Sequence, residues 1–118
     1  MIEEKTITIL GREVRMRYCA AAETGYEKLS GRTMAVFAQS GEATQQDFIY
    51  LGYAAIIAAY SRDHKEPPVT AEEILFEVSP QEIIELISTV VTLRNAWYHV
   101  PEVMDDQKTE EEEDPKNV

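Results

Sequence analysis

Tyr18-Cys-Ala-Ala-Ala-Glu-Thr-Gly-Tyr-Glu-Lys-Leu-Ser-Gly-Arg32 directly follows two short strand-like segments. Apolar side chains recur in this stretch at the i, i+4 and i+7 spacing of one helix face, at Ala22, Tyr26 and Leu29. Gly31 stands where a helix can end in a left-handed residue. Gly25 costs about 1 kcal/mol relative to Ala inside a helix, which indicates close packing against a neighbour. We therefore predict a helix over residues 19–30 that opens a helical domain.

The segment before this helix alternates apolar and polar residues. The apolar positions of its two runs are Ile7, Ile9, Val14, Met16 and Tyr18. Gly11-Arg12 separates the runs and reads as a two-residue turn, so residues 5–18 are predicted to form a β-hairpin. Because an isolated hairpin is marginally stable, it must pack against the helices.

A second helix is predicted from Thr44 to about Ser61. The Thr44 hydroxyl can cap its first turn, and Asp47 occupies the third helical position. The run from Leu51 to Tyr60 contains no charge, so this helix is either central in the fold or covered by another chain. Residues 33–38, between the two helices, are apolar and ambiguous between strand and helix.

Two capping boxes predict two further helices. Thr70-Ala-Glu-Glu73 opens a short helix that ends near Val78, and Ser79-Pro-Gln-Glu82 opens a helix over about 80–98. The spacing in the last helix directs a set of apolar side chains toward the core, namely Ile83, Ile87, Val90 and Trp97. A second set widens this stripe, namely Ile84, Leu86, Val91 and Leu93.

The predicted fold class is therefore mainly α (α+β), with an N-terminal β-hairpin packed on a bundle of about four to five helices. Residues 1–101 form one domain. Residues 102–118 hold eight acidic and two basic side chains and no aromatic residue. Because such a segment cannot bury enough apolar surface to offset its ordering entropy, we expect a disordered acidic tail.

The charge and cysteine content exclude several classes of function. A net charge of −11 without a basic patch argues against nucleic acid and anionic membranes as partners. One cysteine, Cys19, excludes an intramolecular disulfide. The N-terminus has no leader pattern, and no apolar run is long enough to span a membrane, so we expect a soluble, intracellular protein.

No group of residues predicts chemistry. His64 and His99 are 35 positions apart, which does not fit a zinc site, and Cys19 has no activating neighbour. We therefore expect no catalytic residue, no cofactor and no metal. The candidate site is a partner-binding surface of apolar and aromatic side chains, namely Phe48, Leu51, Tyr53, Ile56, Ile57, Tyr60, Trp97 and Tyr98. Packing in the chain's own core is the alternative for each of them.

The order of these motifs resembles the small tail assembly chaperones of long-tailed bacteriophages and prophages, over most of residues 5–103. The segments that carry the resemblance are the hairpin, Tyr18–Gly31, Asp47-Phe-Ile-Tyr-Leu-Gly-Tyr-Ala-Ala-Ile-Ile-Ala-Ala-Tyr60, Pro68-Val-Thr-Ala-Glu-Glu-Ile74, Pro80-Gln-Glu-Ile-Ile84 and Asn95-Ala-Trp-Tyr-His-Val-Pro101. It implies a non-enzymatic protein, corresponding to the short form that such phages make.

Members of this family bind the long helical tape measure protein and keep it soluble while tail tube subunits polymerise around it. The resemblance therefore implies the tape measure protein as partner, the tail tube protein as a further one, and self-association. It places the chain in the cytoplasm of the bacterial host and not in the mature virion. Two alternatives stay open: a structural head–tail connector or tail-completion protein, and a small acidic regulatory binder.

Overall fold

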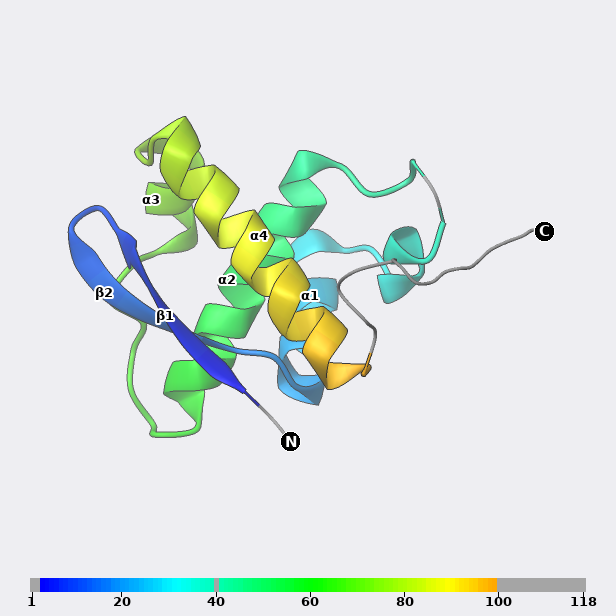
Figure 1. Ribbon diagram of the computed structural model, residues 1–118, viewed down its shortest axis with the longest axis horizontal. Coiled ribbons are helices and arrows are strands. Elements are labelled where there is room, and N and C mark those ends of the chain that lie inside the picture. Colours follow the sequence, from blue (N-terminus) through cyan, green and yellow to red (C-terminus); the bar gives the residue numbers. More distant parts are fainter. Residues whose placement is uncertain (1–2, 40, 100–118) are drawn as a thin grey trace, which may run out of the picture.

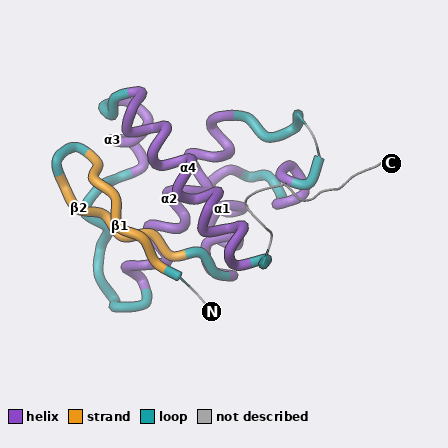
Figure 2. The backbone as a smooth tube through the Cα atoms, viewed as in Figure 1, coloured by secondary structure: helices purple, strands orange, loops and turns teal. Residues whose placement is uncertain are grey.

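The computed structural model describes residues 3–39 and 41–99. Within them a two-stranded antiparallel sheet precedes four α-helices and one short 3-10 helix (Figure 1; Figure 2). The elements are β1 Glu4–Ile9, β2 Arg12–Arg17, α1 Ala20–Ser30, η1 Met34–Phe37, α2 Gln45–Ser61, α3 Ala71–Phe76 and α4 Pro80–Trp97. This architecture confirms the predicted mainly helical α+β class. The predicted acidic tail, residues 102–118, lies outside the described residues.

The hairpin turns at Leu10 and Gly11, one residue earlier than predicted. Ile9 pairs with Arg12 across the strands, so two residues form the loop. Their φ angles are 54° and 76°, as a type I′ turn requires. The predicted Gly11-Arg12 turn is wrong because the I′ geometry, whose twist matches that of the strands, needs positive φ at Leu10.

One face of the hairpin is buried against the helices. All five apolar side chains of the predicted alternation are at most 5% exposed, namely Ile7, Ile9, Val14, Met16 and Tyr18. Strand β1 lies against α4 and β2 against α2. The helices therefore supply the apolar surface that the hairpin requires.

Helix α1 ends at Gly31 as predicted. This residue has a φ of 74°, and its N–H donates to the Glu27 carbonyl at 3.0 Å. Ala22 and Tyr26 are fully buried, but Leu29 is 36% exposed, so its predicted core position is wrong. The reason is that α1 packs on α2 one turn earlier, where a Cβ added to Gly25 would stand 3.4 Å from Cβ of Ala54.

Helix α2 is central, since α1, β2, α3 and α4 all pack against it. It begins with a capping box, in which Thr44 accepts from the Asp47 N–H and Asp47 accepts from the Thr44 N–H at 2.8 Å. Asp47 is buried and also accepts from the Tyr26 hydroxyl and the Arg32 guanidinium, both at 2.8 Å. Burial alone would raise the pKa of Asp47, but these donors hold it below its ordinary value.

Both predicted capping boxes at α3 and α4 are present. The pairs are Thr70 with Glu73 and Ser79 with Glu82. Each glutamate also contacts the hairpin: Glu73 forms an ion pair with Arg12 at 3.0 Å, and Glu82 accepts from the Leu10 N–H at 2.8 Å. The hairpin turn is thereby joined to the beginnings of two helices.

The buried stripe of α4 differs from the predicted one. The fully buried side chains are Leu86, Val90 and Leu93. Ile83, Ile87 and Trp97 are half-buried, and Ile84, predicted to widen the core stripe, is 61% exposed. Helix α4 is rotated toward Leu86 because α2 admits this side chain at Gly52, where an added Cβ would stand 2.9 Å from Cγ of Leu86.

Candidate partner-binding surface

The eight predicted partner-binding residues differ in exposure. Leu51 and Ile56 are fully buried, so a partner cannot reach them while the core is intact. Five are half-buried, namely Phe48, Tyr53, Ile57, Tyr60 and Trp97. Tyr98 is 47% exposed. The uncharged run Leu51–Tyr60 therefore serves mainly as core, because other elements surround α2.

Two tyrosines of α2 fasten other elements to this helix. The Tyr60 hydroxyl accepts from the Arg15 N–H at 3.2 Å, and the Arg15 guanidinium lies 4.5 Å from the Tyr60 ring centroid. The Tyr53 hydroxyl donates to the Val69 carbonyl at 3.4 Å, and burial raises the pKa of this phenol. These contacts hold the hairpin and the segment before α3, so both tyrosines have roles within the chain.

Phe48 belongs to a row of aromatic rings. Its ring centroid lies 5.1 Å from that of Phe37, which in turn lies 5.0 Å from that of Tyr26, and both pairs meet edge to face. This row connects η1 to α1 and α2. Phe48 therefore packs inside the chain as well.

Trp97 and Tyr98 close the end of α4 onto the beginning of α1. The Trp97 ring centroid lies 5.6 Å from that of Tyr18. Glu23 Oε2 accepts from the hydroxyls of Tyr18 at 2.7 Å and Tyr98 at 2.6 Å. Burial, with this carboxylate, raises the pKa of Tyr18, and the hydrogen bond to Glu23 raises that of Tyr98. The exposed Tyr98 ring is thus fixed in place by its hydroxyl.

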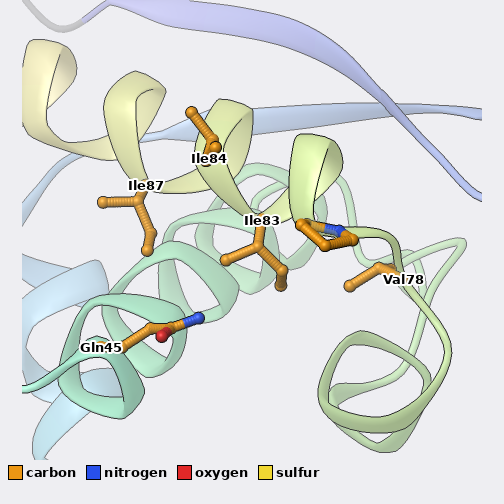
Figure 3. A pocket seen from close by; sticks show the side chains of 6 residues that line it. Gln45, Val78, Ile83, Ile84 and Ile87 are labelled. Atoms are coloured by element: carbon orange, nitrogen blue, oxygen red, sulfur yellow. The ribbon is translucent and has the colours of Figure 1, made fainter.

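An open apolar groove lies beside α4, and we call it the α4 groove. It encloses about 450 Å³ and is lined by Gln45, Val78, Pro80, Ile83, Ile84 and Ile87. Ile83 and Ile87 extend from α4 toward Gln45 at the start of α2, and Val78 lies at the other end (Figure 3). Five of the six lining side chains are hydrocarbon, so the groove offers apolar contact and one amide.

Further apolar side chains are exposed on α3, shortly before Val78 in the sequence. Phe76, the last residue of α3 and two residues before Val78, is 79% exposed, and Leu75 is 37% exposed. Large apolar side chains that a folded chain leaves uncovered in one region mark candidate interaction sites.

A second groove, which we call the α1–α2 groove, encloses about 420 Å³. It is lined by Ala21, Thr24, Gly25, Lys28, Leu29, Ile57, Ala58 and Ser61. Ile57 is the one predicted partner-binding residue that lines either groove. Several of its lining residues on both helices are small, namely Ala21, Gly25, Ala58 and Ser61, and Lys28 adds a positive charge.

Sequence reasoning missed the α4 groove because it assigned Ile83, Ile84 and Ile87 to the core. One signal was present: apolar residues on α4 occupy more positions than a single stripe can bury. The excess side chains had to face either solvent or a partner.

Two further properties of the described residues concern metal ions and membranes. Residues 3–39 and 41–99 contain no group of three His, Cys, Asp or Glu side chains arranged to hold a metal ion. No helix in the same part of the chain has the length and apolarity needed to cross a membrane. Comparisons of the chain with protein-family models, with curated proteins and with solved structures found no match.

Proposed function

We propose that this protein is a tail assembly chaperone of a long-tailed bacteriophage or prophage. It binds the tape measure protein, keeps it soluble and assists polymerisation of the tail tube around it. The proposal joins the order of the sequence motifs to an apolar surface on the folded chain.

The α4 groove is the observation that carries the proposal. A chaperone of this kind needs apolar surface that is exposed before the partner arrives and covered afterwards. Ile84 is 61% exposed beside the half-buried Ile83 and Ile87, although burying such a side chain stabilises a protein by about 1.5–3 kcal/mol. This unused apolar surface supports binding of a helical stripe on another protein.

A non-enzymatic role is part of the proposal. The α4 groove is lined by hydrocarbon side chains and one amide, whereas acid–base or nucleophilic catalysis requires titratable groups in contact with the substrate. The groove is therefore suited to binding and not to a reaction.

The proposal includes place and partners. The chain acts in the cytoplasm of the bacterial host and is absent from the finished virion. The tape measure protein is its main partner, the tail tube protein is a further one, and several copies cover one tape measure protein with self-association between them.

Co-expression tests this function. The chain is expressed together with the long helical protein encoded just downstream of it, and the soluble fraction of that protein is measured. We expect the partner to be soluble with this chain and insoluble without it. Equal solubility in both cases would refute the proposal, and mass spectrometry that finds this chain in purified virions would favour the structural alternative.

A further inference from the structure

We propose that the α4 groove binds an amphipathic helix that carries Lys or Arg on the flanks of its apolar stripe. The proposal rests on the function proposed above and adds the chemistry of the segment that the groove recognises. Two features carry it: the elements that form the groove and the charges around it.

The elements that form the groove favour a helical occupant. Its lining comes from α4, from Val78 before it and from Gln45 at the start of α2. Neither β1 nor β2 contributes, so the groove has no strand edge with which an extended peptide could form main-chain hydrogen bonds. A helix satisfies its own backbone groups and needs apolar anchors at i, i+4 and i+7, which Ile83, Ile84 and Ile87 can contact.

The charges around the groove are negative. Residues 33–61 and 71–93, which include all its lining residues, contain no Lys or Arg. Two exposed glutamates adjoin the lining residues in the sequence: Glu77 directly precedes Val78, and Glu42 stands three positions before Gln45. An occupant with basic flanks is therefore attracted to these glutamates, and one with acidic flanks is repelled by them.

Two arginines from other elements reach the starts of α3 and α2, and both are paired. Arg12 of the hairpin contacts Glu73 at 3.0 Å, and Arg32 contacts Asp47 at 2.8 Å. Their charges are therefore largely balanced by these partners. Glu42 and Glu77 keep the surroundings of the groove negative.

The same charges disfavour two other occupants. The chain's own segment 102–118 carries a net charge of −6 and would bring further acidic side chains to surroundings that are already negative. A second copy joined groove to groove would bring Glu42 and Glu77 of one copy toward those of the other. Like charges in both arrangements oppose binding, which leaves a basic partner helix as the occupant.

Synthetic peptides test the proposal on the full-length chain. The first is a helical peptide of about five turns with Leu at i, i+4 and i+7 and with Lys on both flanks of this stripe. The second replaces every Lys by Glu, and the third keeps the Lys residues but scrambles the Leu positions. Fluorescence anisotropy of each labelled peptide gives its affinity.

We expect the Lys-flanked peptide to bind about tenfold more tightly than the Glu-flanked one at low salt, since several exposed charge pairs each contribute modestly. Raising the ionic strength to about 0.1 M shortens the Debye length to about 10 Å and narrows this difference. The scrambled peptide binds weakly. Equal affinity for the Lys- and Glu-flanked peptides, or no binding of either, would overturn the proposal.

Variants locate the binding. Ile84→Ser removes an exposed apolar anchor of the groove and is expected to weaken binding of the Lys-flanked peptide about tenfold. Glu77→Lys is expected to reduce the preference for Lys over Glu flanks. Leu29→Ser changes an exposed side chain of the α1–α2 groove and is the matched control. If Leu29→Ser weakens binding as much as Ile84→Ser does, the assignment to the α4 groove is wrong.

Other outcomes separate this inference from the proposed function. Self-association that Ile84→Ser abolishes in sedimentation would assign the groove to a second copy and contradict the proposal. A chain that solubilises the tape measure protein but binds Lys- and Glu-flanked peptides alike retains its function and loses the charge inference. A chain that prefers the Lys-flanked peptide but does not solubilise the tape measure protein would retain the inference and refute the function.

Discussion

The backbone N–H of Leu10 donates a hydrogen bond of 2.8 Å to Oε2 of Glu82, 72 positions further along the chain. Leu10 has a positive φ of 54°, a conformation that costs a residue with a side chain about 1–2 kcal/mol. The other oxygen of Glu82 accepts from the Ser79 N–H at 3.2 Å. One carboxylate therefore supports the strained turn of the hairpin and caps α4.

This shared carboxylate predicts an order of stabilities. Ser79→Ala removes a helix cap and is expected to lower the free energy of unfolding by about 1 kcal/mol. Glu82→Ala is expected to lower it further, because it also removes the acceptor of the Leu10 N–H. Gln81→Ala, on the exposed side of the same turn, is the control. Urea unfolding measures all three, and a Glu82→Ala variant as stable as Gln81→Ala would contradict the account.

Gly25 and Gly52, which lie where helices pack against each other, are expected to change the stability in opposite directions when replaced by alanine. At Gly52 a Cβ would stand 2.9 Å from Cγ of the fully buried Leu86, and overpacking of this kind costs about 1–3 kcal/mol. At Gly25 the nearest atom is 3.4 Å away, so Ala can gain up to about 1 kcal/mol of helix propensity. Thermal unfolding of Gly52→Ala and Gly25→Ala compares the two variants. A Gly52→Ala protein more stable than the native chain would refute the close contact of Gly52 with Leu86.

Stability is expected to fall in acid. Hydrogen bonds from Arg12 to Glu73 and from Leu10 to Glu82 lower the pKa of these carboxyls, and the donors around Asp47 outweigh its burial. The folded state therefore binds fewer protons than the unfolded state below the ordinary carboxyl pKa of about 4. The stabilisation is present above that pH and is lost as the pH falls through the lowered values.

Asp47→Asn tests the acid dependence at one position. It removes a buried carboxylate that accepts from Tyr26 and Arg32, so we expect a loss of about 2 kcal/mol at neutral pH. We also expect a shallower fall in unfolding free energy between about pH 5 and pH 2. Urea titrations at several pH values measure both, and an unchanged slope would contradict the lowered pKa of Asp47.

Local patterns predicted most of the secondary structure. The capping boxes at Thr70 and Ser79, the cap at Thr44 and the helix end at Gly31 were all confirmed, because each depends on residues within three or four positions. The alternation along the hairpin was confirmed for the same reason. The turn was misplaced by one residue, since its support by Glu82 is a contact between distant parts of the chain.

The candidate surface was less predictable. Helical periodicity identifies an apolar face but not which part of a wide face meets a neighbour. The contact of Leu86 with Gly52 sets the rotation of α4, and this contact exposes Ile84. The uncharged run of α2 was open to two interpretations, and the structure buries Leu51 and Ile56 because four other elements surround this helix.

Suppression of aggregation is the most direct test of the proposed chaperone. Tape measure protein is diluted from denaturant into buffer with increasing amounts of this chain, and light scattering is recorded. We predict that the native chain and Leu29→Ser suppress scattering at stoichiometric amounts, and that Ile84→Ser requires a clear excess. Scattering that is the same with and without the native chain would contradict the account.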